Sequence, residues 1–163
     1  MNEAYVDLYS DHTELGRWLR SKNIIEKDGD FLVLHGGVAQ AVNEFNMPLD
    51  EINRLCRPWY AVPRKEISTV NVQPFFSGTT SPFWYRGYFL DPKASQAQID
   101  STLRIYKVKE IWVGHDIIHH VSRLYNDKVV GLDVDEHEGT HEGLLMLNNK
   151  YYRVDDKGLR TLL

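Results

Sequence analysis

The sequence predicts a layered α/β or α+β fold, in which helices flank a mixed sheet. Residues 31–34 and 111–113 are short, wholly apolar runs, which is typical of buried strands. Between them, apolar residues recur at helical spacing after the Met47-Pro48 step and after a capping-box pattern at residues 95–98. No repeat or linker divides the sequence, so we expect residues 1–163 to form a single domain.

The other elements follow from local patterns. Residues 11–14 resemble a capping box that opens a helix, and residues 27–30 predict a turn before the first strand. Residues 61–90 are irregular and rich in aromatic residues, and a loop of this length is usually functional. Residues 129–134 predict a third strand. Residues 143–154 predict a C-terminal hairpin closed by two asparagines, which tolerate positive φ.

Composition excludes several classes of protein. The chain is 42% hydrophobic and 26% charged, an ordinary globular balance. A formal net charge of −4 with scattered basic residues argues against nucleic acid as a partner. No apolar run approaches the roughly 18 residues that span a bilayer, and no signal peptide is visible, so the cytoplasm is favoured for the chain as given. The single cysteine, Cys56, forms no internal disulfide and is expected in the core.

Two histidines stand at the ends of predicted strands, each beside glycine. His35 follows residues 31–34 and precedes two glycines, and His115 follows Gly114 after the strand at residues 111–113. Ligands in layered α/β proteins bind beyond such strand ends, and histidine is the commonest metal ligand. The two residues therefore predict a shared metal site. The alternative is a pair of histidines that are hydrogen-bonded at strand ends without a ligand.

Arg86 lies in an aromatic stretch, SPFWYRG, at residues 81–87. Stacking against aromatic rings would hold its guanidinium ready for bidentate contact with a phosphate. The alternative is a surface arginine that stacks on Trp84 or Tyr85 for packing alone.

The remaining histidines give weaker signals. His119 and His120 are adjacent, so their side chains point in different directions and do not easily face one metal. His137 and His141 have helical spacing, but the glycines around them favour an acidic, solvated loop. A structural zinc site formed by this second pair is therefore the weakest hypothesis.

In this order, these motifs resemble the second half of the calcineurin-like metallophosphoesterases, most closely the bacterial serine/threonine-phosphatase-like branch. The matching segments are FLVLHGGV at residues 31–38, SPFWYRG at residues 81–87, VGH at residues 113–115, and the tail from residue 126 through the hairpin. The resemblance covers roughly residues 11 to 160.

The resemblance implies an αββα sandwich with two divalent metal ions, manganese, iron or zinc, that hydrolyse a phosphoester. His35 and His115 would both ligate the second metal, Arg86 would contact the substrate phosphate, and Asp133 would orient a ligand. The family's Gly-Asp-x-His, Gly-Asp-x-x-Asp-Arg-Gly and Gly-Asn-His-Glu motifs are absent, and Asp116 replaces the usual threonine. We therefore expect this chain to be the C-terminal half of that domain, with an incomplete metal site.

Two readings of function stay open on the sequence. In the first, the chain is part of a metal-dependent phosphoester hydrolase whose N-terminal half is missing. In the second, it is a non-catalytic half-domain that acts as an interaction module or self-associates as a homo-oligomer. In the second reading, the sheet face left uncovered by the absent half would be an apolar contact surface.

Overall fold

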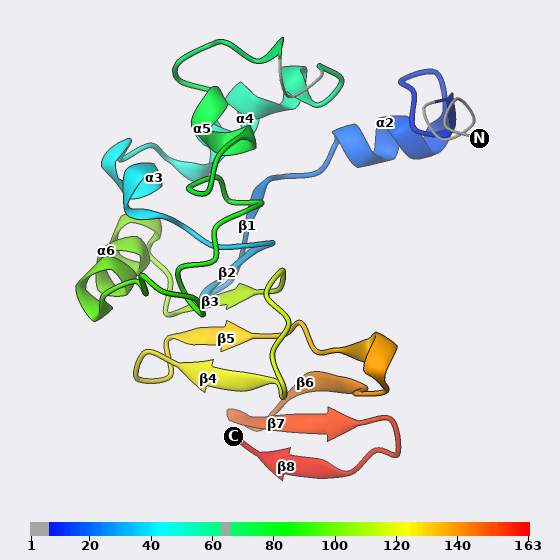
Figure 1. The fold of residues 1–163 in the computed structure, drawn as a ribbon, viewed down its shortest axis with the longest axis vertical. Helices are drawn as coiled ribbons and strands as arrows, with labels where there is room; N and C mark the ends of the chain where they lie inside the picture. Colours follow the sequence, from blue (N-terminus) through cyan, green and yellow to red (C-terminus); the bar gives the residue numbers. More distant parts are fainter. Residues whose placement is uncertain (1–6, 63–65) are drawn as a thin grey trace.

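The structure is a computed structural model that describes residues 7–62 and 66–163 (Figure 1). Its helices are α2 (Glu14–Arg20), α3 (Gln40–Glu44), α4 (Leu49–Cys56), α5 (Gln73–Phe76) and α6 (Gln96–Tyr106), with short 3-10 turns η1 (Arg57–Trp59) and η3 (Glu136–Glu138). Its strands are β1 (Ile25–Asp28), β2 (Phe31–Leu34), β3 (Glu110–Val113), β4 (Ser122–Leu124), β5 (Val129–Gly131), β6 (Glu142–Leu147), β7 (Lys150–Asp155) and β8 (Arg160–Leu162).

The central element is a five-stranded mixed sheet with the order β1-β2-β3-β5-β4. β2, β3 and β5 run parallel, whereas β1 and β4 pair antiparallel at the two edges. Parallel pairing of β2 with β3 requires a long crossover, and the chain supplies it through α3 to α6. The predicted mixed α/β class, with a mixed sheet and flanking helices, is therefore confirmed.

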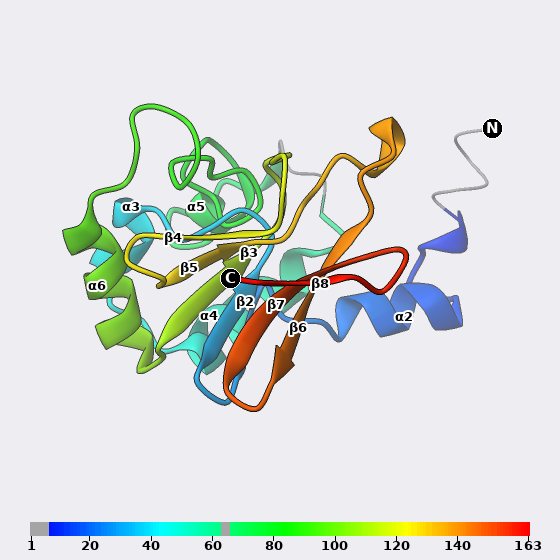
Figure 2. The same cartoon turned by 90° about the horizontal axis from the view of Figure 1, so that it is seen from below.

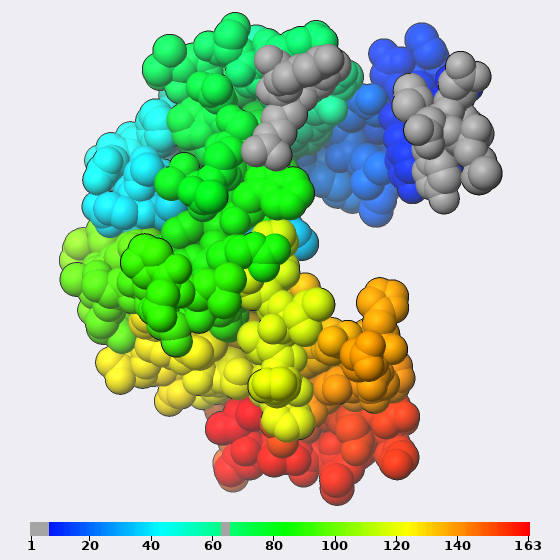
Figure 3. Space-filling model, viewed as in Figure 1, coloured from blue at the N-terminus to red at the C-terminus, as the bar shows by residue number. Residues whose placement is uncertain are grey.

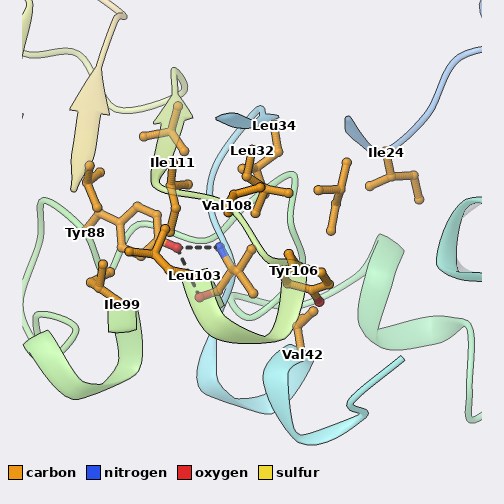
Figure 4. Packing of buried hydrophobic residues seen from close by; sticks show 14 of the residues in the cluster. Ile24, Leu32, Leu34, Val42, Tyr88, Ile99, Leu103, Tyr106, Val108 and Ile111 are labelled. Carbon is orange, nitrogen blue, oxygen red and sulfur yellow. Dashed lines mark hydrogen bonds between the residues drawn. The ribbon is translucent and has the colours of Figure 1, made fainter. Parts of the chain in front are cut away.

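One face of this sheet carries the hydrophobic core. Leu32 is fully buried and Leu34 nearly so, whereas Val33 between them is 36% exposed, as the twofold alternation of a strand requires. On the buried side, α6 contributes Ile99 and Leu103, which pack with residues of β2 and β3 (Figure 4). Ser95 caps α6 by accepting a hydrogen bond from the backbone of residue 98, as predicted.

The three-stranded sheet β6-β7-β8 lies beside the five-stranded sheet, next to its β4 edge (Figures 1 and 2). The Arg123 guanidinium lies 4.4 Å from the ring centre of Tyr151 on β7 and also donates to Glu110 on β3. Glu110 accepts a further hydrogen bond from the Trp112 indole. The contact of Arg123 on β4 with Tyr151 on β7 therefore joins the two sheets, and Glu110 holds the Arg123 side chain in place.

Several predicted boundaries change in the structure. The first helix is capped by Thr13 and not by Asp11, and the third strand ends at Gly131 instead of residue 134, which forms only an isolated bridge. The C-terminal hairpin is confirmed, with Asn148 and Asn149 both at positive φ. β1, β4, β8 and α3 were not predicted because they are short and lack a clear apolar period.

The space-filling view shows a molecule that is hollowed on one side, between α2 and the segment around η3 (Figure 3). The carboxyl ends of β3 and β5 point toward this side (Figure 1). In the described residues, no helix has the length and apolar character needed to cross a membrane.

Truncation of Leu32 tests the position of the core. Leu32→Ala removes a fully buried side chain and should lower the free energy of unfolding by about 2–5 kcal/mol. Leu147→Ala makes the same chemical change at a position that is 42% exposed and should cost no more than about 0.5 kcal/mol. Urea unfolding followed by circular dichroism measures both values, and equal losses would contradict this packing.

Candidate phosphate-binding site

The structure brings His35 and His115 together. They directly follow β2 and β3, which are parallel neighbours in register, Leu34 opposite Val113. The backbone N–H of Gly114 donates to the His35 carbonyl at 2.9 Å and extends this pairing beyond the strands. The two imidazole centres lie 4.7 Å apart, with their planes inclined by 55°. Two side chains that are 80 positions apart in sequence thus share one edge of the sheet.

Glycine is required after His35 because another loop lies directly against the chain there. The backbone N–H of Gly36 donates to the Pro82 carbonyl at 2.7 Å. A Cβ atom at Gly36 would come within 2.9 Å of that carbonyl oxygen, and one at Gly37 within 2.8 Å of the Tyr85 ring. Gly37 also has φ +149°, which disfavours other residues. The two glycines therefore let the aromatic loop, residues 81–87, approach His35.

Tyr88 makes a second contact between the loop at residues 81–87 and the segment after His35. Its side chain is 1% exposed, and its hydroxyl accepts from the Val38 N–H at 3.0 Å and donates to the Val38 carbonyl at 3.3 Å (Figure 4). Burial raises the pKa of Tyr88, so the hydroxyl stays protonated. The segment that carries Arg86 is thereby anchored to the segment that carries His35.

Arg86 and Asp116 form an ion pair at this edge. Arg86 Nη1 donates to Asp116 Oδ1 at 2.5 Å. The arginine side chain is 47% exposed, whereas the carboxylate is only 4% exposed. Sequence reasoning treated Asp116 only as a departure from a motif, although its place directly after His115 was a usable signal. In the part of the chain that the structure describes, the guanidinium is held by this carboxylate, and no stacking of Arg86 on an aromatic ring is found.

His115 sits in an unusual local environment. Its φ of +67° lies in the left-handed region that non-glycine residues seldom adopt, and its ring packs nearly perpendicular to the Trp84 ring, with centres 5.6 Å apart. Burial lowers the pKa of His115, and the positive charge of Arg86 and the neighbouring His35 lower it further. The imidazole is therefore neutral at neutral pH. Within the described residues its Nε2 atom is buried without a hydrogen-bond partner.

A cavity of about 410 Å³ opens beside the two histidines. Its lining combines the two imidazoles with an acidic rim from the segment after β5: His35, His115, Ile117, Asp133, Val134, Asp135, Glu136 and His137. A larger cavity, of about 530 Å³, lies beside β1 and the start of α4, and it contains none of the predicted site residues. The smaller cavity is the candidate site, because the two contacting imidazoles of His35 and His115 line it together with carboxylates.

The other candidate residues do not join this site as nucleophile or ligands. Cys56 is fully buried on α4, and burial raises the pKa of its thiol to about 12, so it does not supply a thiolate. His120 pairs with Glu142 at 2.7 Å and is exposed, as is His119. His137 lines the same cavity from the exposed turn η3, but a zinc site formed with His141 has no third ligand in the described residues.

Comparison with known proteins gives a clear structural match. No protein-family model and no curated protein matches the chain. A solved structure of a cold-active protein tyrosine phosphatase is 36% identical, with a TM-score of 0.87, over 98% of this chain and 47% of that one. The cold-active protein-tyrosine phosphatase of a psychrophilic Shewanella species is 35% identical, with the same TM-score, over 98% of this chain and 48% of that one. The chain thus spans about half the length of these structures.

This match corrects the family resemblance inferred from the motifs. The chain is similar to proteins described as tyrosine phosphatases, so the assignment to calcineurin-like metallophosphoesterases is wrong. The phosphatase character that the motifs implied agrees with the match. The motifs misled because a histidine after a strand and an arginine among aromatics describe a local geometry rather than one family.

The predicted divalent metal is corrected as well. No group of three or more His, Cys, Asp or Glu side chains that could hold a metal ion occurs in residues 7–62 and 66–163. His35 and His115 are two imidazoles, fewer than the three or four protein ligands of a typical zinc site. Their convergence therefore calls for another chemical role.

Removal of Arg86 tests the electrostatics of the site. Arg86→Ala should raise the pKa of His115, because it removes the nearby positive charge that disfavours the imidazolium ion. In the unmodified chain we expect the pKa of His115 to lie below 6.5. Titration of the imidazole signals by NMR measures both values. Arg54→Ala, at an exposed position on α4, is the matched control and should leave the pKa unchanged.

Proposed function

We propose that this chain supplies the phosphate-binding part of a phosphoester hydrolase that acts on phosphorylated protein. The observations that support this proposal are the contact between the His35 and His115 rings and the ion pair that holds Arg86 to Asp116, the residue after His115. The similar solved structures are described as protein tyrosine phosphatases, which supports phosphotyrosine as the substrate class.

Each residue has a role that its chemistry supports. Arg86 has N–H groups beyond the one that Asp116 accepts, and a guanidinium can bind two phosphate oxygens at once. Because its pKa is lowered, the His115 imidazole can accept a proton at neutral pH. His35, at 4.7 Å between ring centres, can donate a hydrogen bond to the same phosphate.

Hydrolysis would then use water as the nucleophile, since the one thiol of the chain is buried and protonated. Water attacks phosphorus, and the bond between phosphorus and the ester oxygen breaks. The proton that leaves the water is taken up by the neutral imidazole and is passed to the departing oxygen, which yields inorganic phosphate and the free hydroxyl.

The matched phosphatases are about twice as long as this chain, which supports a catalytic centre that includes residues from a complementary segment. We therefore propose that the chain alone binds phosphate but turns over phosphoesters slowly. Such a segment would also cover the partly exposed side chains of Val33 and Trp112 on the second face of the sheet.

The apolar side chains on the second face of the sheet favour one second candidate function, a non-catalytic interaction module. Phe31 and Trp112 stack with ring centres 4.4 Å apart on the sheet face that also carries Val33. In this case phosphate would not bind at the histidine edge, and Val33→Asp would abolish self-association measured by sedimentation velocity.

Phosphate binding decides between the two candidates. Calorimetric titration with inorganic phosphate should give binding that Arg86→Ala weakens about tenfold or more, because a hydrogen bond to a charged group is lost. His35→Ala should also weaken it, by a smaller factor. Arg54→Ala preserves the net charge of the Arg86→Ala variant and should bind like the unmodified chain. If the unmodified chain fails to bind millimolar phosphate, or if both arginine variants bind equally well, the proposal is wrong.

A further inference from the structure

Asp116 is the most deeply buried charged group at the site. Its side chain is 4% exposed, and its backbone N–H donates to the Gly114 carbonyl at 2.8 Å, across the left-handed His115. One carboxylate oxygen accepts from Arg86, and the other, Oδ2, has no partner in the described part of the chain. A buried carboxylate is costly unless it is paired, so this position needs a structural or functional reason.

The carboxylate is placed poorly for direct phosphate binding. A phosphate anion at the Arg86 guanidinium would be repelled by the negative charge of Asp116. Electrostatics alone therefore predicts that removal of this charge strengthens phosphate binding. Asp116 can favour binding only through the position that it gives to another group.

That other group is Arg86. Its side chain is half exposed, and in residues 7–62 and 66–163 the only hydrogen bond recorded for its guanidinium is the one to Asp116. Without this bond, a long side chain on a loop populates many rotamers, and it must lose that freedom when phosphate binds. With it, one edge of the guanidinium is fixed next to His115, and the remaining N–H groups stay available.

We propose that Asp116 is a positioning residue that holds the Arg86 guanidinium beside His115, ready for phosphate. The inference rests on the proposed phosphate-binding function and adds to it the origin of the arginine's orientation. Asp116 acts through Arg86 and does not touch the substrate.

Whether substitution of Asp116 weakens or strengthens phosphate binding tests the proposal. Asp116→Ala should weaken the binding of inorganic phosphate about tenfold, although it removes a repulsive charge. Asp116→Asn keeps a neutral acceptor of nearly the same shape and should weaken binding less, by about threefold. Unchanged or tighter binding in both variants would overturn the proposal. If the alanine variant does not fold, as shown by circular dichroism, the asparagine variant alone gives the answer.

A double-mutant cycle separates this inference from the proposed function. In the Arg86→Ala background, Asp116→Asn should no longer weaken phosphate binding, because there is no guanidinium left to position. If Arg86→Ala itself leaves the affinity unchanged, the phosphate-binding function fails. If Arg86→Ala weakens binding but Asp116→Asn does not, only the positioning role fails.

Glu110→Gln provides the matched control. Glu110 is 9% exposed, pairs with Arg123 at 3.1 Å, and lies at the opposite end of β3 from His115. The substitution therefore disturbs a comparable carboxylate–arginine pair away from the site. It should leave phosphate affinity unchanged, and a loss equal to that of Asp116→Asn would show that the effect is general and would contradict a specific positioning role.

Discussion

The parallel pairing of β2 with β3 is the constraint on which the site depends. Because the two strands run in the same direction and in register, the residues that follow them emerge side by side. The bond from Gly114 to the His35 carbonyl carries this register one step further. A slip of one residue would send every side chain to the other face of the sheet, so the core packing of Leu32 and Ile111 also maintains the convergence of the histidines.

A second constraint joins the aromatic loop to this edge. The Gly36 and Gly37 backbone accepts close contact with Pro82 and Tyr85, and Tyr88 locks the same segment through Val38. Arg86 is thereby held near His115 by a loop that lies between the two histidines in the sequence. The positive charge of Arg86 and the burial of His115 then act together to keep that imidazole neutral.

Local patterns predicted the strands at residues 31–34 and 111–113, the Ser95 cap and the Asn148-Asn149 turn, because each depends on neighbouring residues. The pairing of Arg86 with Asp116 escaped prediction because it joins residues 30 positions apart that only the fold brings together. Likewise, nothing local showed that Tyr88 would bridge to Val38. The family assignment was wrong because it rested on short local motifs. Such motifs indicate the geometry at strand ends, but they do not determine the chemistry of the whole domain.

The proposed function requires that a phosphate-like anion binds between the Arg86 guanidinium and the His35–His115 pair. A crystal structure of the chain grown with tungstate tests it directly, because the heavy anion is easy to locate. We expect tungstate within hydrogen-bond distance of the Arg86 guanidinium and of at least one of the two imidazoles. Tungstate bound only elsewhere, for example beside the start of α4, or no bound anion at all, would contradict it.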